Sequence, residues 1–163
     1  MGYRKPVVGI VGAGQLARMT AQAAIPLDID LILLAAGADD GAAQVTPQVI
    51  IGSPDDETAM VELASRCDVI TFDHELVDPL VLARIEASGN TVWPSSASMA
   101  LAQNKRRQRQ ELGDLGLPIP AWAPIDTVAD AEAFGNTFGW PMVLKASRGG
   151  YDGRGVWVVG SAA

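Results

Sequence analysis

The sequence has 163 residues, of which 48% are hydrophobic and 19% charged, a composition typical of a globular domain of ordinary size. Its 12 basic and 19 acidic residues give a net charge of -7, which argues against broad binding to nucleic acid or a membrane surface, because both need a basic face. A single cysteine, Cys67, excludes an internal disulfide, and no apolar run approaches the roughly 20 residues of a membrane span, so we expect a cytoplasmic protein.

Short apolar segments alternate with helix-forming segments through the first half of the chain. Pro26 and Gly89 mark the ends of two of these helices. Apolar strands that alternate with helices are typical of a parallel sheet covered on both faces, so we predict an α/β fold with a Rossmann-like first domain. The predicted strands are 7–11, 30–34, 48–51, 68–72 and 91–93, and the predicted helices are 15–25, 55–66 and 79–88.

The pattern changes after Pro94. Serine cap candidates open a helix that we expect to continue to about Gly113 or Gly116. A proline-rich connector, a short helix, a strand, a glycine-rich loop and another strand follow in the segments 116–125, 126–140, 141–147, 148–155 and 156–159. We therefore predict one domain over 1–100 and a second, incomplete one over 101–163.

The first strand runs into Gly12-Ala13-Gly14 and then into a helix. The two glycines allow a tight turn and a close approach to a ligand, and the helix N-terminus directs unpaired N–H groups toward an anion. Gly12, Gly14 and Ala17 fit the dinucleotide fingerprint, but that site also needs an acidic residue at the end of the second strand. That strand ends in Ala35-Ala36 instead, and a tight turn that binds nothing gives the same pattern. Gln15 offers both a donor and an acceptor to a polar ligand.

A second glycine-rich segment lies near the end of the chain. Four glycines fall within residues 149–155, between two apolar strands, and Lys145 precedes them on the first strand. A long loop rich in N–H groups beside a lysine is what covering a triphosphate requires. No G-K-[ST] follows, so the segment is not a Walker loop, and it resembles the flap between strands in kinases and grasp-type ligases. A surface loop without function is the alternative.

Four segments together resemble one family. They are VGAGQLARM (11–19), ITFDHELV (70–77), AQNKRRQRQELGDLGLPIPAW (102–122) and VLKASRGGYDGRGVWVV (143–159). In this order they are similar to the 5-(carboxyamino)imidazole ribonucleotide synthases, ATP-grasp ligases of purine biosynthesis. The resemblance covers essentially the whole chain and implies a pre-ATP-grasp domain followed by the start of an ATP-grasp domain. It also implies that ATP phosphorylates bicarbonate and that the amine of 5-aminoimidazole ribonucleotide is then carboxylated.

The resemblance assigns roles to individual residues. It implies substrate contacts at Gly14, Gln15, Leu16, Glu75, Tyr151 and Asp152. It implies contacts to ATP at Lys105, Lys145, Gly150, Tyr151, Asp152, Gly153, Arg154, Gly155 and Val156, with Asp152 and Arg154 also closest to the chemistry. Arg106, Arg107 and Arg109 are interpreted as solvated helix charges.

The chain departs from the family pattern in two ways: one motif differs, and carboxylate ligands for Mg²⁺ are not found. Where many members have F-E-F-E-N, this chain has Phe72-Asp73-His74-Glu75-Leu76, which removes the amide and leaves Glu75 as the expected substrate contact. His74 is interpreted as structural and not as a metal ligand. No carboxylate cluster for Mg²⁺ is evident here, and the resemblance implies that the metal ligands lie beyond residue 163.

Three interpretations of function remain at this point. The chain is the N-terminal part of the ligase and inactive alone, or a non-catalytic ribonucleotide-binding module, or an NAD-binding domain. The family also implies a homodimer.

Overall fold

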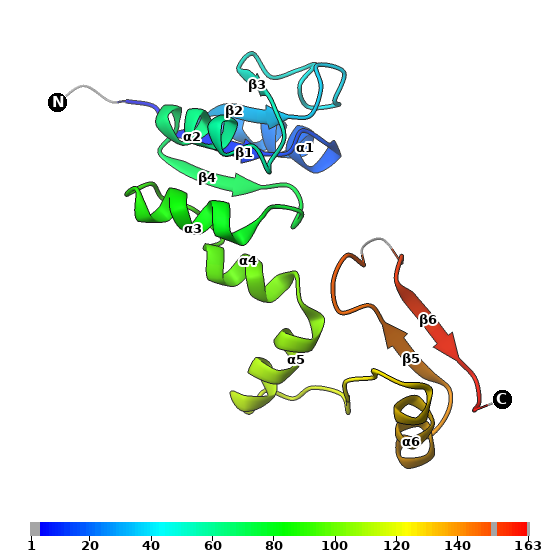
Figure 1. The fold of residues 1–163 in the computed structure, drawn as a ribbon. Coiled ribbons are helices and arrows are strands. Elements are labelled where there is room, and N and C mark those ends of the chain that lie inside the picture. Colours follow the sequence, from blue (N-terminus) through cyan, green and yellow to red (C-terminus); the bar gives the residue numbers. More distant parts are fainter. Residues whose placement is uncertain (1–3, 151–152, 163) are drawn as a thin grey trace. The chain divides into compact units, whose positions relative to one another are not determined.

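The chain forms two units in the structure, a computed structural model that describes residues 4–150 and 153–162. Unit 1 is Met1–Ala100 and unit 2 is Leu101–Ala163 (Figure 1).

Unit 1 is built on a parallel sheet of four strands in the order β3-β2-β1-β4. The strands are β1 (Val7–Val11), β2 (Asp30–Ala35), β3 (Val49–Ile51) and β4 (Val69–Phe72). In the register, Val11 is paired with Leu34 on one side and with Phe72 on the other. The predicted parallel α/β architecture is confirmed.

Helices cover both faces of this sheet. The helical elements of unit 1 are α1 (Gln15–Ala24), the short 3-10 helix η1 (Ile25–Leu27), α2 (Glu57–Arg66), α3 (Pro79–Ala87) and most of α4 (Ser96–Ala102), whose last two residues belong to unit 2. Successive strand residues point to opposite faces, so Val11 and Leu34 belong to a core cluster with α2, α3 and Met99, whereas Ile10 and Leu33 pack with α1. Burial on both faces explains why the strands read as continuous apolar runs.

The helix starts follow directly from the sequence. Asp56 precedes α2, and its carboxylate accepts a hydrogen bond from the Thr58 N–H at 2.9 Å. Asp78 does the same for the Leu80 N–H at 2.8 Å, with Pro79 as the first residue of α3. Each side chain satisfies an N–H that the helix itself leaves without a partner.

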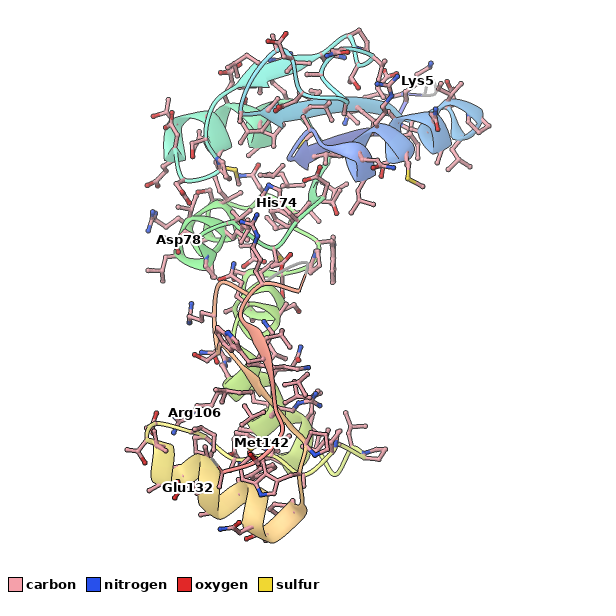
Figure 2. The ribbon with its side chains drawn as sticks, turned by 90° about the vertical axis from the view of Figure 1, so that its right-hand side faces the viewer. Lys5, His74, Asp78, Arg106, Glu132 and Met142 are labelled. Atoms are coloured by element: carbon pink, nitrogen blue, oxygen red, sulfur yellow. The ribbon has the colours of Figure 1, made fainter. Side chains whose placement is uncertain are left out.

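Unit 2 contains two helices and a two-stranded sheet. They are α5 (Lys105–Asp114), α6 (Val128–Phe138) and the antiparallel strands β5 (Met142–Lys145) and β6 (Val156–Val159). Figure 2 labels Glu132 on α6 and Met142 on β5, and Met142 is the buried residue of that strand. The helix α6 begins with a reciprocal capping box between Thr127 and Asp130.

Two sequence predictions were wrong in detail. The helix expected from the serines at 95 to Gly113 or Gly116 is broken, because Asn104 leaves the helical conformation and its side chain accepts from the Arg107 N–H at 3.0 Å, starting α5 anew. The strand expected over 91–93 is reduced to one bridge between Ile70 and Val92.

Candidate functional site

The glycine turn of unit 1, residues 12–14, lies where β1 ends in the middle of the sheet. The chain passes from β1 to β2 on one side and later returns to β4 on the other, so the order of strands reverses between β1 and β4. In open parallel sheets, ligands bind outside the carboxyl ends of the strands at such a reversal. Glu75, two residues after the loop begins at Asp73, belongs to the same edge, because β4 ends at Phe72 beside Val11.

Backbone bonds from two other segments hold this turn. The Gly12 N–H donates to the Leu34 carbonyl at 2.9 Å, and the Ala42 N–H donates to the Ala13 carbonyl at 2.9 Å. The first bond comes from β2 and the second from the irregular segment between β2 and β3. The turn therefore has its shape before any ligand is present.

Asp73 is the third residue that holds the glycine turn in place, and sequence analysis gave it no role. Its Oδ2 accepts a hydrogen bond from the Gly14 N–H at 2.9 Å, and the Asp73 N–H donates to the Val11 carbonyl at 3.2 Å. Its Oδ1 occupies the space beside Gly12, where an added Cβ would come within 1.6 Å of it. The side chain is only 7% exposed, and Oδ1 has no hydrogen-bond partner among the described residues.

His74 is the neighbouring side chain, in the loop that follows β4 (Figure 2). Its Nδ1 accepts a hydrogen bond from the Leu76 N–H at 3.1 Å, which assigns the proton of the neutral ring to Nε2. Nε2 lies 3.7 Å from Asp73 Oδ1. These contacts fit the structural role expected for His74, since each of them is made to its own loop.

The helix α1 starts at the predicted substrate residues. Gly14 is its N-cap and supplies no side-chain cap, and no acidic residue lies in the first turn. Because Arg18 is the first residue whose N–H bonds back, to the Gly14 carbonyl at 3.1 Å, the N–H groups of Gln15, Leu16 and Ala17 have no intrahelical acceptor. Gln15 and Leu16 are exposed, Leu16 by 61%. Two exposed residues at this end of α1, Gln15 and Leu16, thus carry N–H donors without an intrahelical acceptor, whereas Ala17 is buried.

The glycine loop of unit 2, residues 146–155, joins β5 to β6. Lys145 is the last residue of β5, is exposed, and pairs with Val156, the first residue of β6. The Ala146 N–H donates to the Gly155 carbonyl at 2.8 Å, which closes the base of the loop. Gly153 and Gly155 have φ of 81° and 67°, a region that residues with a Cβ rarely adopt.

Lys105 binds this loop from the start of α5. Its backbone N–H donates to the Ser147 carbonyl at 2.9 Å, and its Nζ donates to the Gly150 carbonyl at 3.0 Å. A Cβ on Gly150 would come within 2.8 Å of the Arg154 carbonyl oxygen. The structure therefore brings Lys105 together with Gly150 in the loop, whereas Lys145 lies on β5 directly before the loop begins.

Two of the predicted residues, Tyr151 and Asp152, lie outside the described residues, and the described Arg154 is exposed. Within the described ranges, no group of three or more His, Cys, Asp or Glu side chains could hold a metal ion. No helix in the described part of the chain is long and apolar enough to cross a membrane.

Sequence reasoning missed Asp73 although a signal was present. A carboxylate directly after one parallel strand and a glycine turn after its neighbour must meet at the same edge of the sheet. The hydrogen bond from the Ala42 N–H to the Ala13 carbonyl could not be predicted in this way, because the segment between β2 and β3 is irregular.

Comparison with known proteins places both units in families. Residues 6–103 match the ribonucleotide synthetase preATP-grasp domain family, and residues 110–163 match the ATP-grasp domain family.

Individual relatives match along nearly the whole chain. The N5-carboxyaminoimidazole ribonucleotide synthase of Mycobacterium tuberculosis is 48% identical over 151 residues, which are 93% of this chain and 35% of the relative. The crystal structure of the Staphylococcus aureus enzyme with ADP has a TM-score of 0.87 and 26% identity, covering 99% of this chain and 43% of that chain. The Aspergillus clavatus enzyme, in complex with ADP and 5-aminoimidazole ribonucleotide, has a TM-score of 0.83 and 30% identity over 97% of this chain and 41% of that chain.

The chain thus spans well under half the length of each of these proteins. It belongs to the ribonucleotide synthetase preATP-grasp family, and its sequence matches the N-terminal part of the N5-carboxyaminoimidazole ribonucleotide synthases.

Proposed function

We propose that this chain is the N-terminal part of an ATP-dependent ligase that carboxylates 5-aminoimidazole ribonucleotide with bicarbonate. The observation that carries the proposal is the glycine loop of unit 2, tied by Lys105 and flanked by Lys145, in a chain 48% identical to a synthase of this kind. A relative of known structure holds ADP together with 5-aminoimidazole ribonucleotide, which supports both substrates. The enzyme is expected in the cytoplasm and as a homodimer.

In the proposed reaction, the terminal phosphoryl group of ATP passes to a bicarbonate oxygen, giving carboxyphosphate and ADP. The exocyclic amine nitrogen of the ribonucleotide then forms a bond to the carboxyl carbon, the bond from that carbon to the phosphate oxygen breaks, and phosphate leaves. The amine loses a proton in this step, and Asp152 is the proposed acceptor, with Arg154 beside the phosphate charge. The protein's part is to hold the reactants in place and keep water from carboxyphosphate.

The two units have separate tasks in this proposal. Gly14, Gln15, Leu16 and Glu75 of unit 1 contact the ribonucleotide at the carboxyl edge of the sheet. In unit 2, the N–H groups of the glycine loop surround the ATP phosphates, while Lys105 and Lys145 place ammonium charges on them. The loop residues assigned to ATP are Gly150, Tyr151, Asp152, Gly153, Arg154, Gly155 and Val156, and Tyr151 and Asp152 are also assigned to the ribonucleotide. Magnesium supplies further charge neutralisation at the phosphates, and its ligands are assigned to the part of a synthase that follows residue 163.

A non-catalytic ribonucleotide-binding module is the second candidate, favoured by the two buried core clusters of unit 1. The NAD-binding alternative has less support, because β2 ends in Ala35 without the acidic residue that binds a ribose. The module and the ligase differ in whether unit 2 binds ATP.

The test compares two neighbours on α5 in the chain joined to the rest of a synthase. We expect Lys105→Ala to raise the Kd for ATP at least tenfold, since it removes a charge from the phosphates. Arg106→Ala is the matched control, because Arg106 is exposed and, among the described charged groups, lies within 4.0 Å only of Asp126. The Kd of this variant for ATP should stay within twofold of that of the unchanged protein. Equal effects of the two changes on the Kd for ATP would contradict the assignment of Lys105 to the ATP site. Binding of the ribonucleotide with no response to ATP would favour the module.

A further inference from the structure

The α1 N-terminus already has an anion against it, and that anion is part of the protein. In dinucleotide-binding turns of this shape, a phosphate group sits at the helix N-terminus and accepts from the exposed N–H groups. Here the Oδ2 of Asp73 accepts from the Gly14 N–H at 2.9 Å. The helix has no cap from Gly14 and no acid in its first turn, so Asp73 is the carboxylate that complements its dipole.

The negative charge of Asp73 is poorly screened by solvent and salt. Its side chain is 7% exposed, and its Oδ1 is enclosed against Gly12 with no hydrogen-bond partner among the described residues. Buried charges are screened by salt much less than exposed ones. The basic side chain found within 4.0 Å of this carboxylate in the described ranges is His74, whose Nδ1 accepts from the Leu76 N–H of its own loop.

We propose that Asp73 is a specificity-determining residue of unit 1. Its carboxylate takes the position that a phosphate would take at the α1 N-terminus, so the glycine turn rejects a ligand that presents phosphate there. For a ribonucleotide, whose assignment as the ligand rests on the proposed function, the 5′-phosphate points away from the turn. The same charge excludes a dinucleotide from this edge of the sheet.

The experiment titrates pyrophosphate into the ¹⁵N-labelled 163-residue chain at pH 8 and follows the amide signals of residues 14–17. We expect no saturation in the wild-type chain below the millimolar range. Asp73→Asn keeps an oxygen for the Gly14 N–H and removes the charge, so pyrophosphate should bind at least tenfold more tightly, about 1.4 kcal/mol. Asp55→Asn is the matched control, an exposed aspartate of unit 1 whose removal changes the net charge equally and should bring no gain.

Two outcomes would overturn the proposal: wild-type binding of pyrophosphate at these amides within threefold of Asp73→Asn, or no gain in Asp73→Asn. If Asp73→Asn loses its dispersed spectrum, Asp73→Ser is compared in the same way. A parallel titration of the wild-type chain with 5-aminoimidazole ribonucleotide tests the proposed function separately. Absence of ribonucleotide binding with a clear gain in Asp73→Asn would refute the proposed function and leave the role of Asp73 standing.

Discussion

Gly12→Ala tests the packing of the glycine turn against Asp73. Gly12 has φ of 111°, so any Cβ there is strained by about 1–2 kcal/mol. The new Cβ would also lie 1.6 Å from Asp73 Oδ1 and 2.4 Å from its Cγ, which forces the carboxylate to move. Overpacking of this kind costs about 1–3 kcal/mol. Together these terms predict a loss of about 2–5 kcal/mol in the free energy of unfolding of unit 1.

The assay is urea unfolding followed by the methyl NMR signals of Ile10, Ile32 and Leu33, which belong to the core of unit 1. Gly89→Ala is the control for the backbone term, because Gly89 also has a positive φ, 89°, but has no atom within 4 Å of an added Cβ. Combining Gly12→Ala with Asp73→Ala should recover about 1–3 kcal/mol relative to the sum of the single changes. The reasoning is refuted if Gly12→Ala costs no more than Gly89→Ala.

Two further predictions concern other parts of the chain. The pKa of Asp130 is held below its ordinary value, first by the Thr127 hydroxyl and then by the backbone N–H groups of Thr127 and Asp126. The ionised Asp130 carboxylate therefore stabilises unit 2 fully when the pH is above the ordinary pKa, and this stabilisation is lost as the pH falls through the lowered pKa. Thr127→Ala should therefore reduce the free energy of unfolding of unit 2 at pH 7, and reduce it less at pH 3, in urea titrations, whereas Thr137→Ala on the same helix should show no such pH dependence. Burial raises the pKa of the Cys67 thiol, so alkylation by iodoacetamide at pH 8 should be slower in the folded chain than in urea, and equal rates would contradict that assignment.

The strands and most helices of unit 1 could be predicted because their signals are local. Burial on both faces makes each strand a continuous apolar run, and Asp56 and Asp78 mark the starts of α2 and α3 by a side chain that caps the helix. The break before Asn104 was missed, since the flanking residues favour helix and only the cap geometry separates α4 from α5.

The candidate site could be predicted only in part. The glycines of both loops are visible in the sequence because a tight turn or a positive φ requires them at those positions. The partners of these loops are not visible, since Leu34, Ala42 and Asp73 reach the glycine turn from distant segments, and the bond from the Lys105 Nζ to the Gly150 carbonyl joins residues 45 positions apart. Proximity of that kind depends on strand order, which composition and periodicity do not specify.

The glycine turn also has a consequence for the order of folding. Gly14 and Asp73 are 59 positions apart, and β1 lies between β2 and β4 in the sheet. Contacts between such distant residues form slowly, because the intervening chain must lose its freedom before the contact can stabilise it. The turn can therefore reach its final shape only after β4 has docked beside β1. During synthesis, a nascent chain that has not yet reached Asp73 has β1, α1 and β2 available but lacks the carboxylate that holds the Gly14 N–H.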